Sequence, residues 1–168
     1  GLNHSDCAIS HDGDNFYFKS SIYADVENCP IIYVNWYGAL VYCNWLSEKQ
    51  GLDKAYNLNN WQLKDSPENV EGYRLPTENE WEYTARGGTE GIPTTYAGSN
   101  NIDEVAWYDV NSGGETHSVG EKQANELGIY DMSGNVNEWT NTFIDPYQVN
   151  RSGDFYHESK YCKVNKRG

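Results

Sequence analysis

The chain has 168 residues, and its 12 Lys and Arg against 25 Asp and Glu give a formal net charge of −13. Leu, Ile, Val and Phe make up only 30 residues, which together with such a charge is typical of a disordered chain. However, 14 Tyr and 6 Trp supply large rings that fill a core when their polar tips are hydrogen-bonded. We therefore expect one folded domain over residues 1–168. The acidic balance argues against a nucleic-acid partner, and no apolar run approaches the roughly 20 residues that a membrane-spanning helix needs.

The first part of the chain is polar and contains two short apolar runs. Residues 11–15 predict a turn. Phe16–Phe18 and Ile31–Val34 are suited to strands or to buried extended segments.

A first helix is predicted after Asn35, a plausible N-cap, and it should end at Gly51. Its apolar residues recur at three- and four-residue spacing: Trp36, Ala39, Leu40, Cys43 and Leu46. Cys43 lies on this stripe, so it is interpreted as a small buried hydrophobe rather than a reactive thiol. With Cys7, Cys29 and Cys162 it permits three disulfide pairings, and the sequence leaves the pairing open.

A second helix is predicted from Thr77 to about Arg86, because Thr77 and Glu80 form a capping box. Its acidic residues are interpreted as structural, since carboxylates near a helix start complement the helix dipole. They are Glu78, Glu80 and Glu82. Residues 87–135 are predicted to be mostly loop.

The segment 131–138 carries the clearest site chemistry. Calcium takes six to eight oxygen ligands from carboxylates and backbone carbonyls, and Asp131 and Glu138 flank a turn that contains Gly134. From these residues alone, a turn with two solvated acids and a calcium loop both stay open. Near the end of the chain, four basic residues are interpreted as a solvated strand edge: Lys160, Lys163, Lys166 and Arg167.

Three phrases, in this order and spacing, resemble the formylglycine-generating enzyme family, also called sulfatase-modifying factors. They are Val34-Asn35-Trp36-Tyr37-Gly38-Ala39 with Tyr42-Cys43-Asn44-Trp45-Leu46-Ser47, Tyr73-Arg74-Leu75-Pro76-Thr77-Glu78-Asn79-Glu80-Trp81-Glu82-Tyr83 with Ala85-Arg86-Gly87-Gly88, and Asn125-Glu126-Leu127-Gly128-Ile129-Tyr130-Asp131-Met132-Ser133-Gly134-Asn135 with Glu138-Trp139. The resemblance covers about residues 30–168. It implies an irregular, loop-rich α+β domain related to C-type lectins.

The resemblance also implies bound calcium. Family members hold one ion in the segment matching 131–138, which makes the side chains of Asp131 and Glu138 and the carbonyls of Gly134 and Val136 its expected ligands. A second family site begins at a pair matching Asn101 and Ile102. The remaining ligands of that site fall where this chain has its own Asn-Ser-Gly-Gly loop.

The family's founding activity is the oxygen-dependent conversion of a sulfatase cysteine to Cα-formylglycine, with copper(I) held by two cysteines. Those cysteines follow an Arg-Gly-Gly-Ser-Trp phrase, of which this chain contains Arg167-Gly168. No residue here is therefore assigned a catalytic role, and copper is expected only with the missing cysteine pair. We expect a piece of a longer chain, truncated at both ends. The family usually has Trp where this chain has Asn137, which should reshape the wall of the pocket.

Two functions stay open at this point. The parent protein is an oxidoreductase acting on a cysteine peptide of the sulfatase type, or the domain is a calcium-stabilised, lectin-like binding and display module without chemistry. The resemblance favours an extracytoplasmic location.

Overall fold

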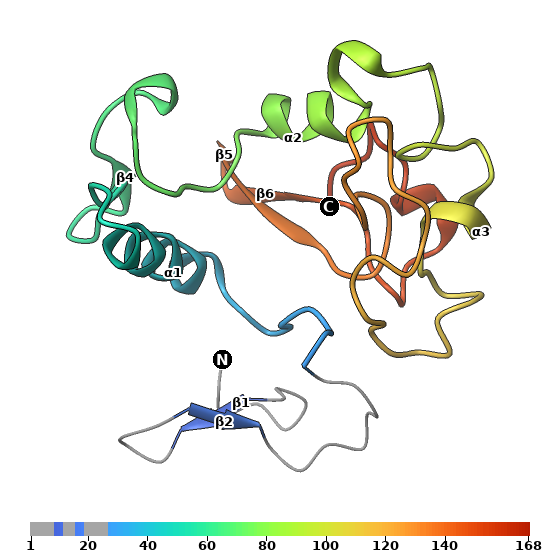
Figure 1. Ribbon diagram of the computed structural model, residues 1–168, viewed down its shortest axis with the longest axis horizontal. Helices are drawn as coiled ribbons and strands as arrows, with labels where there is room; N and C mark the ends of the chain where they lie inside the picture. Colours follow the sequence, from blue (N-terminus) through green and yellow to red (C-terminus); the bar gives the residue numbers. More distant parts are fainter. Residues whose placement is uncertain (1–8, 12–15, 19–26) are drawn as a thin grey trace.

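The computed structural model describes residues 9–11, 16–18 and 27–168. Its helices and strands are short, and long loops connect them (Figure 1). In chain order the elements are β1 (Ile9–His11), β2 (Phe16–Phe18), α1 (Trp36–Lys49), β3 (Tyr56–Asn57), β4 (Gln62–Leu63), α2 (Glu78–Ala85), α3 (Ile102–Val105), β5 (Glu138–Ile144) and β6 (Tyr147–Arg151). Three antiparallel pairs, β1–β2, β3–β4 and β5–β6, are the sheets of this part of the chain. The irregular α+β class is confirmed.

Helix α1 forms where the sequence predicts it. Asn35 caps it, with its side-chain oxygen accepting the Gly38 N–H at 2.8 Å. The buried side of α1 packs on the β3–β4 hairpin in a cluster that includes Leu40, Cys43 and Tyr56. The interpretation of Cys43 as a small buried hydrophobe is confirmed, and burial raises the pKa of its thiol.

The apolar segment before α1 is neither a strand nor buried, so that prediction is wrong. Residues 31–34 form an irregular strap in which Ile31, Tyr33 and Val34 are exposed. Tyr33 has a φ of 61°, a left-handed conformation that a strand cannot contain. By contrast, Phe16–Phe18 is a strand, as predicted, while most of the predicted turn at 11–15 lies outside the described residues.

Helix α2 begins with the predicted capping box. The Thr77 hydroxyl accepts the Glu80 N–H at 3.2 Å, and a Glu80 carboxylate oxygen accepts the Thr77 N–H at 2.7 Å. The same carboxylate receives two hydrogen bonds from the Arg74 guanidinium, each 2.8 Å long. Arg74 holds the pKa of Glu80 at about 2, well below its usual 4.5.

Acid should therefore weaken this helix start. The folded-state pKa of Glu80 is depressed. The contribution of its ionised side chain to the free energy of unfolding is therefore complete above pH 4.5 and is lost as the pH falls towards about 2. The side chain is 46% exposed, so solvent screening limits the effect of Glu80→Gln at pH 7 to about 1 kcal/mol. Urea unfolding at pH 7 and pH 3 checks this, with Glu48→Gln, at the exposed Lys54–Glu48 pair, as the control. If Glu80→Gln lowered the free energy of unfolding equally at the two pH values, the stabilising role of the ionised Glu80 carboxylate would be contradicted.

The β5–β6 hairpin crosses the middle of the molecule, and α2 packs against both strands (Figure 1). Aromatic and β-branched residues in β5 suit a strand, and Asp145-Pro146 suits the turn that follows. Glu138 pairs with Arg151 in the register, so the start of β5 and the end of β6 lie side by side at the open end of the hairpin.

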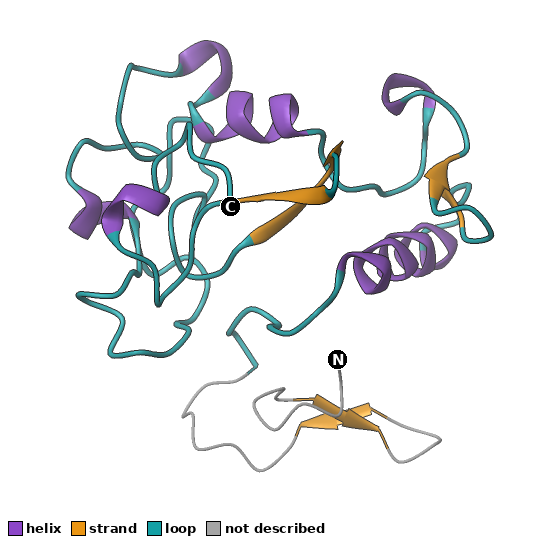
Figure 2. Cartoon of the chain, turned by 180° about the vertical axis from the view of Figure 1, so that it is seen from behind, coloured by secondary structure: helices purple, strands orange, loops and turns teal. Residues whose placement is uncertain are grey.

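Tyrosine and tryptophan tips join segments far apart in the sequence. Trp36 Nε1 donates to the Thr140 carbonyl at 3.0 Å, and Trp139 Nε1 donates to the Val34 carbonyl at 2.9 Å. Both of these rings are half-buried. The rings that fill the interior, as expected, are Tyr56, Trp81, Tyr96 and Tyr108, whereas Trp45 and Tyr130 are exposed. Seen from behind in Figure 2, α1 and the main loop region lie on opposite sides of the β5–β6 hairpin.

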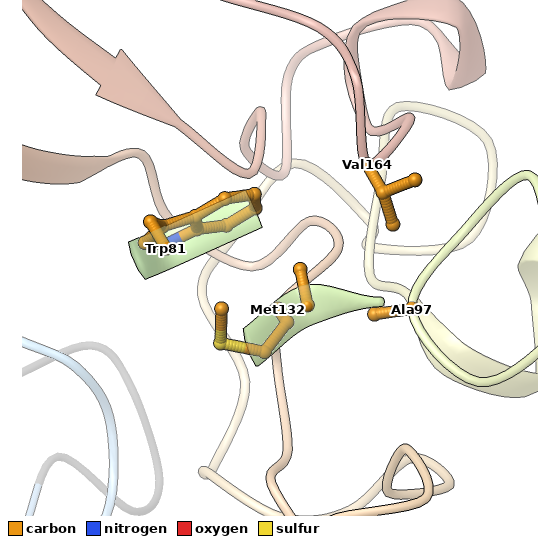
Figure 3. Packing of buried hydrophobic residues seen from close by; sticks show 5 residues of the cluster. Trp81, Ala97, Met132 and Val164 are labelled. Atoms are coloured by element: carbon orange, nitrogen blue, oxygen red, sulfur yellow. The ribbon is translucent and has the colours of Figure 1, made fainter. Parts of the chain in front are cut away.

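Behind α2, Trp81 packs with four further apolar side chains, three of them labelled in Figure 3: Ala85, Ala97, Met132 and Val164. Arg151, only 1% exposed, lies 4.8 Å from the Trp81 ring centroid and forms ion pairs with Glu78 at 2.8 Å and Glu82 at 2.9 Å. The Val164 carbonyl also accepts from Arg151. The acidic residues of α2 therefore have structural roles, as predicted. Glu78 and Glu82 bind a buried arginine, an interaction that the dipole argument did not include.

The basic C-terminal segment is not a strand edge. Ser159–Tyr161 is a 3-10 helix followed by turns, and Arg167 Nε binds Glu78 at 2.6 Å. The prediction missed this ion pair because Glu78 lies far away in the sequence. None of the helices in the described part of the chain is long and apolar enough to cross a membrane.

Candidate functional site

The loop 131–138 runs from the end of a long irregular segment into β5. Three of its residues have a left-handed backbone: Asp131 at φ 58°, Gly134 at 79° and Asn135 at 60°. Its backbone is anchored by hydrogen bonds from the Gly134 N–H to the Ser152 carbonyl and from the Asn135 N–H to the Trp107 carbonyl, both 2.8 Å long. A Cβ on Gly134 would lie 2.3 Å from the Trp107 oxygen, so only glycine fits there.

Asp131, at the start of this loop, has one satisfied and one unsatisfied carboxylate oxygen. Oδ2 accepts the Gly120 N–H at 2.8 Å. Oδ1 is buried and has no hydrogen-bond partner among the described residues. Burial raises the pKa of this carboxyl. A buried acceptor without a partner costs about 1–3 kcal/mol, which makes Oδ1 a position where a bound group would be stabilising.

Glu138, at the other end, is held by a tryptophan. The Trp81 indole N–H donates to Oε2 at 2.6 Å. Burial, together with the nearby charge of Asp131, raises the pKa of Glu138 to about 7 against the opposite effect of the indole hydrogen bond. The charge of Asp131 therefore disfavours the charged form of Glu138, and a cation near both carboxyl groups would remove that penalty.

The donors in this loop fit calcium. The carboxylates of Asp131 and Glu138 and the carbonyls of Gly134 and Val136 are hard oxygen ligands, and the buried Asp131 Oδ1 lacks a partner. No three His, Cys, Asp or Glu side chains of the described chain gather as a metal cluster. A calcium ion here would thus take its remaining oxygens from backbone carbonyls and water.

The predicted second site falls at the start of α3. Asn101 caps this short helix: its Oδ1 accepts the Asp103 N–H at 3.3 Å and its Nδ2 donates to Glu104 Oε1 at 3.1 Å. The Ile102 carbonyl accepts the Ala106 N–H at 2.9 Å. Both residues thus make helix-capping contacts, and their role as calcium ligands stays a prediction.

Beside the loop lies an open groove of about 290 Å³. Its walls come from the strap, from the loop and β5, and from β6 with the segment after it: Ile31, Ile32, Tyr33, Val34, Val136, Asn137, Trp139, Asn150, Asp154, Phe155 and Tyr156. The strap wall is apolar, and the opposite wall carries aromatic rings and three polar side chains. The Trp139 hydrogen bond to Val34 ties the strap to β5.

Asn137 organises the polar wall of this groove. Its Nδ2 donates to Asp154 Oδ2 at 2.7 Å. Asp154 Oδ1 accepts the Tyr156 N–H at 2.9 Å and lies 2.9 Å from His157 Nδ1. Asp154 is the one charged residue lining the groove in the described part of the chain. The sequence marked Asn137 as an unusual residue, but Asp154 and Asn150 carried no local signal and were missed.

Gly168 contacts two residues that line the groove, Asn150 and Asn137. Its N–H donates to the Asn150 carbonyl at 3.1 Å, and a Cβ on Gly168 would lie 3.4 Å from Asn137 Oδ1. Arg167 is held at the same time by Glu78. The last residues of the chain are therefore fixed beside the polar wall.

The described cysteines lie outside the groove. Cys29, Cys43 and Cys162 are free thiols, and none is among the lining residues. Burial raises the pKa of Cys162 to about 12, so this thiol is not a nucleophile near neutral pH. These residues do not fit a copper(I) site, which requires thiolates that converge on one ion.

Together these features define a loop-rich α+β domain with an acidic, partly desolvated loop beside an open groove. Residues 2–168 match the sulfatase-modifying factor enzyme 1-like domain. The chain belongs to this family.

Relatives carry different names. The chain is 42% identical to the chaperone protein LppX of Paenibacillus barcinonensis, over 67% of this chain and 51% of that protein. It is 30% identical to the formylglycine-generating enzyme of Mycobacterium tuberculosis, over 77% of this chain and 38% of that protein. The structure of Treponema denticola variable protein 1 is similar, with a TM-score of 0.72 at 29% identity over 88% of this chain and 68% of that chain. The chain thus spans about half or less of the length of these two sequence relatives.

Proposed function

We propose that this domain binds an extended segment of a partner protein or peptide in the groove, on a fold that one calcium ion stabilises. The observation that carries this proposal is the groove itself. One wall is apolar and exposed, the other is polar and aromatic, and no described cysteine lines it. The name chaperone given to a relative 42% identical supports a function in binding another protein. An extracytoplasmic location stays a prediction.

Asn137 shapes what the groove accepts. The amide is tied to Asp154, so the wall presents a fixed hydrogen-bonding surface instead of a bulky ring. Tyr33, Phe155 and Tyr156 add rings that can contact apolar or cationic side chains. Binding in such a groove requires no chemistry from the protein.

The calcium ion belongs to the loop beside the groove. Asp131, Glu138 and the carbonyls of Gly134 and Val136 would hold it, and when bound it supplies positive charge between two desolvated carboxylates. Because Val136 and Asn137 lie within this loop and also line the groove, an ordered loop keeps the polar wall in place.

Peptide selection tests the groove. Phage-displayed random 12-residue peptides are selected on the calcium-loaded protein, and enriched peptides are measured by fluorescence polarisation against wild type and Asn137→Trp. We expect the tryptophan to fill part of the groove and to weaken binding at least 10-fold. Asn59→Trp, at an exposed position outside the groove, is the control. No enriched peptide, or equal binding to Asn137→Trp, would refute the proposal.

An oxidase is the second candidate, favoured by the enzyme name of the Mycobacterium relative and by the position of Gly168 at the groove. Converting a cysteine thiol, with one water molecule, to an aldehyde and hydrogen sulfide releases two electrons. Reducing molecular oxygen to water takes four, so a thiol reductant must supply the others. The described residues hold no copper ligands, and we derive no step from them.

The full-length protein, supplied with copper(I), oxygen, dithiothreitol and a Cys-x-Pro-x-Arg peptide, should leave the peptide thiol intact. Conversion to an aldehyde would establish the oxidase instead.

A further inference from the structure

We propose that Trp81 is a positioning residue of the calcium site, whose indole N–H orients the Glu138 carboxylate towards the ion. This inference rests on the calcium site proposed above. It adds a residue that lies outside the loop and contacts no expected calcium ligand other than Glu138 by hydrogen bond.

The geometry of the contact is specific. Nε1 of Trp81 lies 2.6 Å from Oε2 of Glu138, a short hydrogen bond of the kind made to charged or strongly accepting groups. Glu138 is 57 residues away in the sequence, so the bond joins the interior face of α2 to the start of β5. One carboxylate oxygen is thereby fixed, which restricts the orientations that remain open to the other oxygen.

The Trp81 ring cannot easily turn away from this position. It is 2% exposed and packs with Met132 and Val164, as Figure 3 shows. Met132 follows Asp131 directly, so the ring packs at one end of the 131–138 loop and hydrogen-bonds the other. The Trp81 side chain therefore interacts with both ends of the 131–138 loop.

Arg151 strengthens the arrangement. Its guanidinium carbon lies 4.8 Å from the centroid of the Trp81 ring. A cation over an aromatic face is attracted to the electron density of the ring, which adds to the contacts that hold the Trp81 ring in place. The ion pairs of Arg151 with Glu78 and Glu82 fix the guanidinium in place.

Orientation of a ligand by an outer hydrogen bond has a known effect on metal sites. Groups that hold a ligand contribute to affinity because the ion does not have to order that ligand itself, and their loss typically costs 10–100-fold in metal affinity. An unrestrained glutamate would instead lose side-chain entropy on binding. Trp81 removes that cost before the ion arrives.

Calcium titration of Trp81→Phe tests the inference. Phenylalanine keeps an aromatic ring in the cluster but has no N–H. Chelator-stripped protein is titrated at pH 8, above the pKa of Glu138, by competition with a chromophoric chelator. We expect the dissociation constant for calcium to rise about 10–100-fold.

Trp36→Phe is the matched control, because it removes an indole hydrogen bond of 3.0 Å to the Thr140 carbonyl, which lies on β5 outside the 131–138 loop and is not an expected calcium ligand. It should lower the melting temperature in EGTA and leave the calcium affinity unchanged. If Trp81→Phe does not fold, β-(3-benzothienyl)alanine placed at position 81 keeps the bicyclic shape without the N–H.

The outcomes separate the two proposals. Wild type without calcium binding refutes the calcium site, and the role of Trp81 with it. Wild type that binds, with Trp81→Phe within twofold of it, refutes the role of Trp81 and leaves the calcium site standing. Equal loss of affinity in Trp81→Phe and Trp36→Phe would also refute it, because general destabilisation would then explain both.

Discussion

Replacing Arg151 by methionine is expected to lower the free energy of unfolding by about 3 kcal/mol, because it removes one of the two cationic partners of the buried Glu78 carboxylate and leaves it only the exposed Arg167. Arg151 is 1% exposed and Glu78 is 7% exposed, and they are joined at 2.8 Å. Methionine has a similar length but no charge, so the substitution opens little space. The Val164 carbonyl and one side of Glu82 lose their partner as well.

Urea unfolding at fixed calcium concentration and pH 7 measures this loss. Arg86→Ala is the control, since Arg86 pairs with the same Glu82 at 2.7 Å but is 44% exposed, and such surface pairs contribute about 0–1 kcal/mol. Similar losses for the two variants would show that the buried pair stabilises no more than a surface pair. Adding Glu78→Leu to Arg151→Met should restore part of the stability, because it removes a buried charge that only the exposed Arg167 would still pair with.

Removing calcium should have the second largest effect. At a calcium concentration 100 times the dissociation constant, a ligand that binds only the folded state contributes about 2.7 kcal/mol, which EGTA should abolish. Thermal unfolding at pH 8 with calcium and with EGTA measures the shift. Asp131→Ala should be as unstable in calcium as wild type is in EGTA, because it removes the carboxylate whose Oδ1 lacks a partner.

Asp65→Ala is the control for charge. It removes an exposed acidic group outside both predicted calcium sites, where Oδ1 accepts the Ser66 N–H at 2.7 Å, and it should leave the response to EGTA intact. Identical melting curves with and without EGTA for wild type, together with no calcium in elemental analysis, would rule out the site. An EGTA response that persists in Asp131→Ala would place the ion elsewhere in the chain.

The helices could be predicted because their signals are local. Asn35, and Thr77 with Glu80, cap helices through side chains three residues from the groups they satisfy, so short windows of sequence contain the whole interaction. The same holds for the three- and four-residue spacing that predicts an apolar stripe with Leu40 and Cys43. Neither prediction needs knowledge of distant contacts.

Much of the rest depends on distant contacts and was not predictable in this way. The groove needs the strap at 31–34 to meet Asn150 and Asp154, and nothing near the strap in the sequence shows that it is exposed. Nothing near Arg151 in the sequence distinguishes it from a surface arginine, and its partners on α2 are seen only in the structure. Of the site, Asp131 and Glu138 were predicted from a motif, whereas the role of Trp81 needed the structure.

The strap is attached to the rest of the molecule by side chains rather than by a sheet, with the Trp139 indole bound to the Val34 carbonyl across 105 residues of sequence. The groove therefore forms only when the strap is folded together with the segments that carry Trp139, Asn150 and Asp154. A ligand held between them favours contacts between parts of the chain that lie far apart in the sequence, instead of one local element. Occupancy of this groove would therefore be linked to the stability of the whole domain.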